Sequence, residues 1–139
     1  MRRVVVTGIG IVSSIGSNAA EVEASLREGR SGVRHAPDYA EHGFRCQVHG
    51  QPTVDLDALI DKRQRRFMGD GAAYNYVAME QAIADSGLEP DEVSHERTGL
   101  IVGSGGPSTK NMLSAHLTVL EKKSPKRMGP FMVTRCMSS

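Results

Sequence analysis

The chain has 139 residues, of which 39% are hydrophobic and 24% are charged, and its formal net charge at pH 7 is +1. This length allows one domain with a real core but not two, and the composition excludes a disordered chain. The near-zero net charge gives no argument for nucleic-acid or membrane binding. No apolar run is long enough for a signal peptide or a membrane span, and Cys46 and Cys136 match no zinc or redox spacing. We therefore expect a cytoplasmic protein.

The first third of the chain predicts a strand, a glycine-rich loop and a short helix. Val4–Val6 is β-branched and apolar, which is typical of a buried first strand. A loop with several glycines follows over residues 8–16. Asn18, with Glu21 three residues later, predicts the start of a helix, and Gly29 predicts its end.

The middle third predicts a half-exposed strand and a long helical region. Residues 44–48 alternate between apolar and polar side chains, as a strand with one solvated face does. Helical spacing then extends from about Asp57 to Ser86. We expect an interruption near Gly69 and Gly71 and an end at Gly87.

The last third contains a short apolar run, Leu100–Val102, that breaks into the glycine turn of residues 103–106. An unbroken apolar run bounded by turn residues predicts a strand buried on both faces. A helix is expected over residues 109–121. A strand, a glycine turn and a helix in this order are how α/β proteins build sites at the carboxyl ends of strands. A last helical stretch opens at Gly129-Pro130 and reaches residue 139 without a stop signal.

These elements predict an incomplete α/β fold. The connections between the three predicted strands are long enough for crossovers, which favours a mixed or parallel sheet. Three strands would leave an apolar edge unpaired, and soluble proteins avoid such edges. We therefore interpret residues 1–139 as one domain portion at the amino-terminal end of a larger fold.

A dinucleotide-binding loop is one alternative for the first glycines. Gly8 and Gly10 fit the pattern G-x-G-x-x-G, but Ser13 occupies the third glycine position. The acidic residue that should follow about 20 residues later falls on Glu28, which lies in a predicted helix. The pattern therefore fits only in part.

Metal and nucleophile sites find less support. His35, His42, Cys46 and His49 form a possible metal set, but their spacings match no recurring zinc pattern. The segment Gly103-Ser104-Gly105 is too tight for a nucleophile elbow, G-x-S-x-G. From spacing alone, the sequence shows no catalytic constellation.

Five segments, in order along essentially the whole chain, resemble the β-ketoacyl-acyl carrier protein synthases, with most similarity to the type I branch. They are Val5–Gly16, Leu26–Gly32, Met79–Leu88, Gly103–Gly106 and Met128–Phe131. The resemblance implies a thiolase-like fold, layered αβαβα, of which this chain is the first part of the N-terminal half. It also implies a homodimer, no cofactor and no metal.

The implied reaction is a decarboxylative Claisen condensation in fatty acid biosynthesis. An acyl group passes from acyl carrier protein to a cysteine thiolate, and the carbanion from malonyl-carrier protein attacks the resulting thioester. The family's nucleophilic cysteine, two histidines and lysine fall beyond Ser139, and neither Cys46 nor Cys136 aligns with the nucleophile. We therefore expect no catalytic residue in this chain, which alone should be inactive and poorly folded.

The resemblance assigns two sets of site residues. Gly106, Pro130, Val133 and Met137 match positions of the acyl channel and dimer interface. A second set matches basic positions that dock the acidic carrier protein: Lys62, Arg63, Arg66, Lys123 and Lys126. Two other hypotheses stay open at this point: a non-catalytic ketosynthase-like partner that sets chain length, and a Rossmann nucleotide-binding module.

Overall fold

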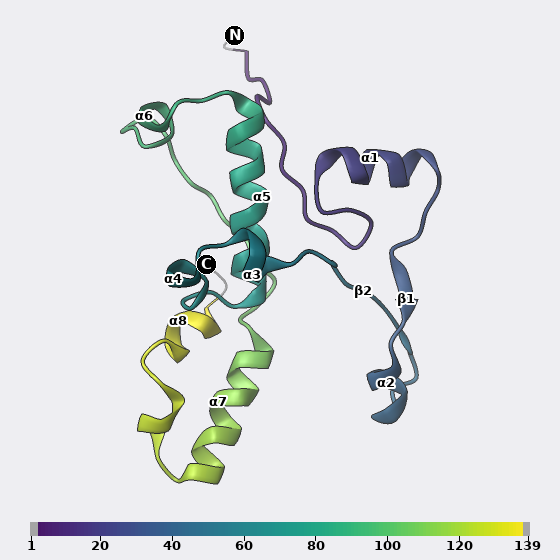
Figure 1. The fold of residues 1–139 in the computed structure, drawn as a ribbon, viewed down its shortest axis with the longest axis vertical. Helices are drawn as coiled ribbons and strands as arrows, with labels where there is room; N and C mark the ends of the chain where they lie inside the picture. Colours follow the sequence, from purple (N-terminus) through teal and green to yellow (C-terminus); the bar gives the residue numbers. More distant parts are fainter. Residues whose placement is uncertain (1–2, 138–139) are drawn as a thin grey trace. The chain divides into compact units, whose positions relative to one another are not determined.

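The computed structural model describes residues 3–137 (Figure 1). The helices are α1 (Ala19–Arg27), α2 (Pro37–Glu41), α3 (Leu56–Leu59), α4 (Lys62–Arg65), α5 (Asp70–Ser86), α6 (Pro90–Val93), α7 (Thr109–Lys122) and α8 (Met132–Cys136). The strands are β1 (Val33–His35) and β2 (Val48–Gly50), and the 3-10 helix η1 covers Pro125–Met128. The chain divides into a first unit, Met1–Val54 with Ala78–Leu88, and a second unit, Asp55–Val77 with Glu89–Ser139. Among the described residues, no helix is long and apolar enough to cross a membrane.

Local signals predicted α1 correctly. Asn18 caps the helix, and its side-chain oxygen accepts a hydrogen bond from the Glu21 backbone N–H at 3.0 Å. The Glu21 carboxylate accepts from the Ser17 backbone N–H at 2.8 Å, one residue before the cap. These bonds satisfy amide groups that have no partner within the helix. Gly29 follows with φ +65°, a backbone conformation that glycine adopts without a steric penalty.

The described strands form one two-stranded antiparallel sheet, so the prediction of a mixed or parallel sheet is wrong for this part of the chain. Val33 faces Gly50 and His35 faces Val48. The strand predicted over residues 44–48 is only partly right, because β2 begins at Val48. The connection from β1 to β2 holds the short helix α2, and antiparallel neighbours need no longer crossover.

The first glycines lie against the backbone of α5. A Cβ at Gly8 would meet the Ala82 carbonyl oxygen, and one at Gly10 would meet the Ala78 carbonyl oxygen. Between the glycines, the Ile9 N–H donates to the Asp85 carboxylate at 2.9 Å. Ile11 N–H likewise donates to the Gln81 side chain at 3.1 Å. The glycines thus let an extended segment pack closely on α5. Side chains of α5 accept the hydrogen bonds of this segment's amides, which would point to a phosphate in a dinucleotide-binding loop.

The two apolar runs predicted as buried strands are not strands in the described structure. Val4 is 94% exposed, and Ile101, in the second unit, is 96% exposed. No strand is assigned to Val4–Val6 or to Leu100–Val102. A strand exists only when a neighbouring strand supplies hydrogen bonds, and no described residue does so for either run. Their apolar, β-branched composition favours a strand, but composition does not show whether another strand lies beside it.

The predicted helical region is broken into α3, α4 and α5, of which α3, α4 and the first part of α5 belong to the second unit. Asp55 caps α3 and Asp61 caps α4 with side-chain hydrogen bonds, so each short helix has its own start signal. The predicted break near Gly69 is confirmed, whereas Gly71 lies inside α5, which ends before Gly87 at φ +68°. Helix α7 matches its predicted range within one residue and contacts both η1 and α8. The buried apolar side chains of this unit are Leu56, Ile60, Ala73 and Val77.

The packing of Gly10 on α5 predicts that Gly10→Ala destabilises the full-length protein. The added methyl group would overlap the Ala78 carbonyl, and overpacking costs about 1–3 kcal/mol. Gly71→Ala is the matched control, because nothing lies within 4 Å of its Cβ position. That exposed helical glycine should tolerate alanine or gain up to about 1 kcal/mol. Urea unfolding measures both changes, and equal effects of the two substitutions would contradict the packing.

Candidate functional site

The predicted docking cations lie in two clusters of the second unit. The α4 cluster comprises Lys62, Arg63, Arg65 and Arg66, and the α7 cluster comprises Lys122, Lys123, Lys126 and Arg127. Asp61 fixes the start of α4 by accepting from the Arg63 backbone N–H at 2.7 Å. Arg66 is the C-cap of α4 and keeps helical dihedrals, so the predicted i, i+1 and i+4 arrangement of Lys62, Arg63 and Arg66 is present.

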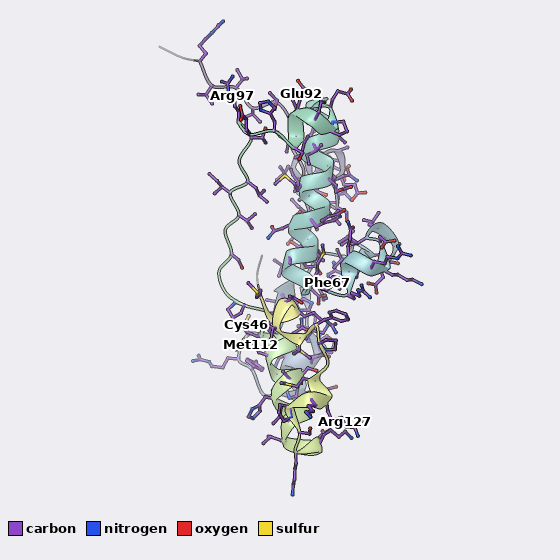
Figure 2. The ribbon with its side chains drawn as sticks, turned by 90° about the vertical axis from the view of Figure 1, so that its left-hand side faces the viewer. Cys46, Phe67, Glu92, Arg97, Met112 and Arg127 are labelled. Carbon is purple, nitrogen blue, oxygen red and sulfur yellow. The ribbon has the colours of Figure 1, made fainter. Side chains whose placement is uncertain are left out.

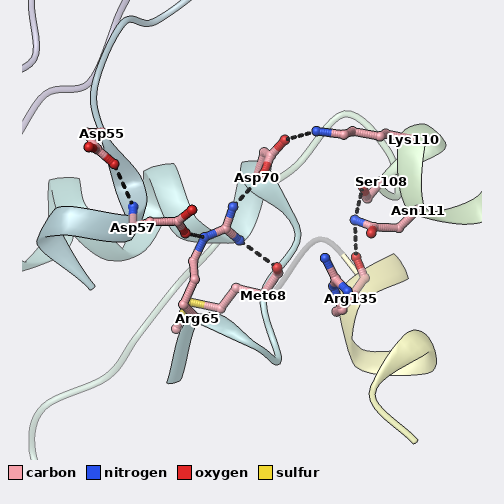
Figure 3. Close-up of polar contacts among 9 residues, drawn as sticks. All are labelled: Asp55, Asp57, Arg65, Met68, Asp70, Ser108, Lys110, Asn111 and Arg135. Atoms are coloured by element: carbon pink, nitrogen blue, oxygen red, sulfur yellow. Dashed lines mark hydrogen bonds and ion pairs between the residues drawn. The ribbon is translucent and has the colours of Figure 1, made fainter. Parts of the chain in front are cut away.

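Arg65 differs from its neighbours because it points inward (Figure 3). Its side chain is 20% exposed and pairs with Asp57 at 3.1 Å and with Asp70 at 2.7 Å. A third bond runs from its guanidinium to the Met68 carbonyl oxygen at 2.8 Å. Arg65 is therefore an internal tie between α3, the α4–α5 connection and α5, and its charge is neutralised locally.

Asp70 completes this network at the start of α5. Its other carboxylate oxygen is 3.3 Å from the Lys110 ammonium of α7 (Figure 3). Burial alone would raise the pKa of Asp70, but hydrogen bonds from Arg65 and Lys110 and their positive charges outweigh burial and lower it below its usual value. Asp70 therefore stays ionised at neutral pH and ties α5 to both α4 and α7.

Arg66 lies over two aromatic rings. Its guanidinium carbon is 4.9 Å from the centroids of both the Phe67 and the Phe131 ring. The rings meet edge to face, with centroids 4.8 Å apart. By contrast, Lys62 and Arg63 are exposed, and neither of their side chains forms an ion pair or a hydrogen bond among the described residues. The α4 cluster thus holds two freely exposed cations, Lys62 and Arg63, and two fixed cations, Arg65 and Arg66.

The α7 cluster is formed by the end of α7 and by η1. Lys123 is the C-cap of α7 and has a left-handed backbone, with φ 48° and ψ 32°. Cations at this end of a helix are favoured by the helix dipole. Thr118, Lys122 and Arg127 line an open hollow of about 400 Å³. Figure 2 shows Arg127 at the far end of α7 from Phe67. No ion pair of the described residues involves Lys123 or Lys126, so both charges face solvent.

The predicted channel residues lie around α8 and in the loop before α7. Val133 belongs to α8 and is 75% exposed, Met137 is its exposed C-cap, and Pro130 precedes it. Gly106 lies in the loop, where its N–H donates to the Ser104 hydroxyl at 3.4 Å. Gly106 does not have a positive φ, and a Cβ there would meet nothing within 4 Å. The described chain therefore contains no steric reason for glycine at this position.

Helix α8 is fixed at its C-terminal end by residues that the sequence did not single out. The Asn111 side-chain amide donates to the Arg135 carbonyl at 3.1 Å and to the Ser108 hydroxyl at 2.8 Å (Figure 3). The Ser108 backbone N–H donates to the Cys136 carbonyl at 2.9 Å. Gly69 permits this approach, because a Cβ there would be 2.7 Å from the Arg135 carbonyl. Of these signals, only the predicted break at Gly69 was visible in the sequence.

The described residues hold no group of three or more His, Cys, Asp or Glu suited to a metal ion. Within the possible metal set, the His49 ring packs edge-on against Tyr39 at 5.5 Å. The Cys46 thiol lies 3.7 Å from the Val48 carbonyl. Both cysteines are free. Chemically, the described residues present cations and exposed apolar side chains, which suits binding a partner.

The whole chain, residues 1–139, matches the family described as "Beta-ketoacyl synthase, N-terminal domain", and it belongs to that family. It is 46% identical over 139 residues to 3-oxoacyl-[acyl-carrier-protein] synthase 1 of Haemophilus influenzae, covering 100% of this chain and 34% of the relative. The chain thus spans about a third of that relative's length.

Two solved structures are similar in fold. One is a beta-ketoacyl synthase from Burkholderia phymatum, with a TM-score of 0.80, 33% identity and coverage of 99% of this chain and 34% of the other. The other is the ishigamide ketosynthase/chain length factor, with a TM-score of 0.80 and 28% identity over 96% of this chain and 33% of the other. The fold is therefore that of a ketosynthase N-terminal domain.

The lowered pKa of Asp70 predicts a pH dependence. A carboxylate whose folded pKa lies below its unfolded value of about 3.9 adds stability above that value, and the stability is lost as the pH falls through the folded pKa. Asp70→Asn should therefore destabilise the full-length protein at pH 7 and reduce its loss of stability below about pH 4.

Asp91→Asn is the control, because Asp91 forms no ion pair among the described residues. Thermal unfolding between pH 7 and pH 3 makes the measurement. An Asp70→Asn curve parallel to that of the unaltered protein would contradict the role of the carboxylate.

Proposed function

We propose that the chain is the amino-terminal third of a type I β-ketoacyl-acyl carrier protein synthase of fatty acid biosynthesis. The observation that supports this most is the 46% identity, over the whole chain, to a relative named 3-oxoacyl-[acyl-carrier-protein] synthase 1. The full-length protein would be a cytoplasmic homodimer with a thiolase-like fold layered αβαβα. It would extend an acyl chain by condensation with malonyl-carrier protein.

In this proposal the chain supplies binding surfaces and the rest of the protein supplies the chemistry. The reaction needs a thiolate nucleophile, proton transfer and donors for an oxyanion. The family's nucleophile, histidines and lysine are expected beyond Ser139. Cys46 is exposed and Cys136 half-buried, and the described residues show no charged or basic side chain hydrogen-bonded to either thiol. We therefore propose neither cysteine as the nucleophile.

The exposed cations are proposed to dock the carrier protein. Lys62, Arg63 and Arg66 of the α4 cluster and Lys123 and Lys126 of the α7 cluster are the candidates. Carrier proteins are acidic, and complementary charge speeds encounter and fixes orientation more than it adds affinity. Within residues 3–137, Lys62, Arg63, Lys123 and Lys126 form no ion pair, which supports this role because their charges stay available to a partner.

The exposed apolar side chains near α8 are proposed to line the acyl channel at a dimer interface. Val133 and Met137 are 75% and 51% exposed, and such side chains are usually covered in a finished assembly. We assign Pro130 and Gly106 to the same acyl channel. The open space beside Gly106 is compatible with an acyl chain passing there.

A non-catalytic partner that sets chain length is the second candidate. The similarity to the ishigamide ketosynthase/chain length factor supports this second candidate, because the name of that structure includes a chain length factor as well as a ketosynthase. The residue at the nucleophile position of the full-length protein separates the two candidates. A Rossmann module is disfavoured, because Asp85 and Gln81 already accept from the amides of Ile9 and Ile11.

Condensation activity tests the proposal directly. The full-length protein should release carbon dioxide from malonyl-carrier protein when acyl-carrier protein is present, and residues 1–139 alone should not. Loss of activity after replacing the downstream nucleophilic cysteine is the control. A full-length protein that folds, carries the cysteine and does not condense would contradict the proposal, as would condensation by the isolated 139 residues.

The exposed cations predict a salt-sensitive docking step. Arg63→Glu or Lys126→Glu in the full-length protein should slow carrier association, with the largest loss at low ionic strength. Reaction with small thioesters that lack the carrier should survive. Arg97→Glu is the matched charge reversal, since Arg97 lies at the opposite end of the second unit from Arg127 (Figure 2). If all three variants bind the carrier as the unaltered protein does, the clusters are ordinary surface.

A further inference from the structure

Two phenyl rings of the second unit hold one guanidinium. The Arg66 guanidinium carbon is 4.9 Å from the centroid of each ring, Phe67 and Phe131, and the ring planes meet at 75°. A cation over an aromatic face is attracted by the ring's quadrupole. In addition, Arg66 Nε donates to the Arg63 carbonyl at 3.1 Å. The guanidinium is therefore restrained in position although the residue is exposed.

The Phe131 ring connects this cation to α8. Phe131 is the N-cap of α8, and its carbonyl accepts from the Arg135 N–H at 3.0 Å and from the Thr134 hydroxyl at 2.9 Å. A helix of five residues gains little from its own hydrogen bonds, so contacts with other parts of the chain, such as those of the Phe131 ring with Phe67 and Arg66, help to decide where it lies. The contacts of the Phe131 ring therefore link the α4 cluster to the start of α8, the helix that carries Val133.

We infer that Arg66 is a positioning residue that couples docking of an acidic carrier protein to the placement of α8. The inference rests on the proposed function, and it concerns how that function is regulated. The guanidinium lies over the rings and still has N–H groups that can pair with a carboxylate. Because the rings fix the cation beforehand, less entropy is lost on pairing. Coupling is reciprocal, so a carboxylate bound to Arg66 in turn restrains Phe131 and α8.

Within residues 3–137, Lys62 and Arg63, in the same cluster, differ from Arg66 in that no ring contact restrains their side chains. Their side chains have no ring beneath them and no ion pair among the described residues. They attract an acidic partner through charge alone, which a lysine supplies as well as an arginine. Arg66→Lys keeps the charge but loses the planar group that lies over two rings, so it separates the contribution of the rings from that of the charge.

Carrier binding by full-length variants tests the inference. Phe131→Leu removes a ring but changes no charge, and it should weaken binding about two- to fivefold, as should Arg66→Lys. The double variant should bind no more weakly than Arg66→Lys alone, because the two groups act through one contact. Phe44→Leu is the matched control, since Phe44 packs on Tyr39 in the first unit. Circular dichroism checks folding, and Phe67→Leu replaces Phe131→Leu if the latter does not fold.

Hydrogen exchange at α8 distinguishes coupling from simple stabilisation. If Arg66 only stabilised the fold, adding carrier protein would change amide exchange in α8 equally in the unaltered protein and in Arg66→Lys. Carrier protein should slow amide exchange in α8 in the unaltered protein and do so much less in Arg66→Lys. Equal protection in both proteins would overturn the inference, as would unaltered carrier binding by Arg66→Lys and Phe131→Leu. Additive losses in the double variant would also overturn it.

Failure of the inference and failure of the proposed function give different results. If the proposed function is wrong, the unaltered protein does not bind an acyl carrier protein, and Arg63→Glu has nothing to weaken. If only the inference is wrong, the unaltered protein binds the carrier, Arg63→Glu weakens binding, and Phe131→Leu matches the Phe44→Leu control.

Discussion

The second unit depends on the half-buried guanidinium of Arg65. It binds Asp57, Asp70 and the Met68 carbonyl at once, so α3, the connection after α4 and the start of α5 share one cation. An ion removed from water needs such complete pairing, because the cost of desolvation is offset only when its hydrogen bonds are met. Asp70 extends the network to Lys110 of α7. Of its neighbours in the α4 cluster, Lys62 and Arg63 form no ion pair among the described residues and stay exposed.

Where a signal is local, the sequence was sufficient. Asn18 and Glu21 predicted the start of α1, and Gly29 and Gly87 predicted helix ends, because capping and left-handed glycine need only neighbours in the chain. The range of α7 followed from its apolar spacing for the same reason. The family and the two basic clusters were likewise visible in the sequence, since motifs and charges are properties of single segments.

What the sequence could not supply was the identity of distant neighbours. Val4–Val6 and Leu100–Val102 were predicted as strands from their composition, but a strand also needs a hydrogen-bonding neighbour, and none of the described residues provides one. The contact of Arg66 with Phe131 joins residues that lie far apart in the chain. The inward orientation of Arg65 is also a tertiary effect, since the four basic residues within positions 62–66 look alike in the sequence and only the contacts with Asp57 and Asp70 distinguish Arg65.

Lys123 ends α7 in a left-handed conformation that costs a residue with a side chain about 1 kcal/mol more than glycine. Glycine, the usual residue at a left-handed helix end, would avoid that cost but would remove a positive charge from the α7 cluster. Stability and charge therefore make opposite demands on one position. A protein selected for heat resistance alone would drift toward glycine here, whereas one selected for rapid capture of an acidic partner would retain lysine. The left-handed backbone at residue 123 is thus the local conformational cost of keeping a positive charge at the end of α7.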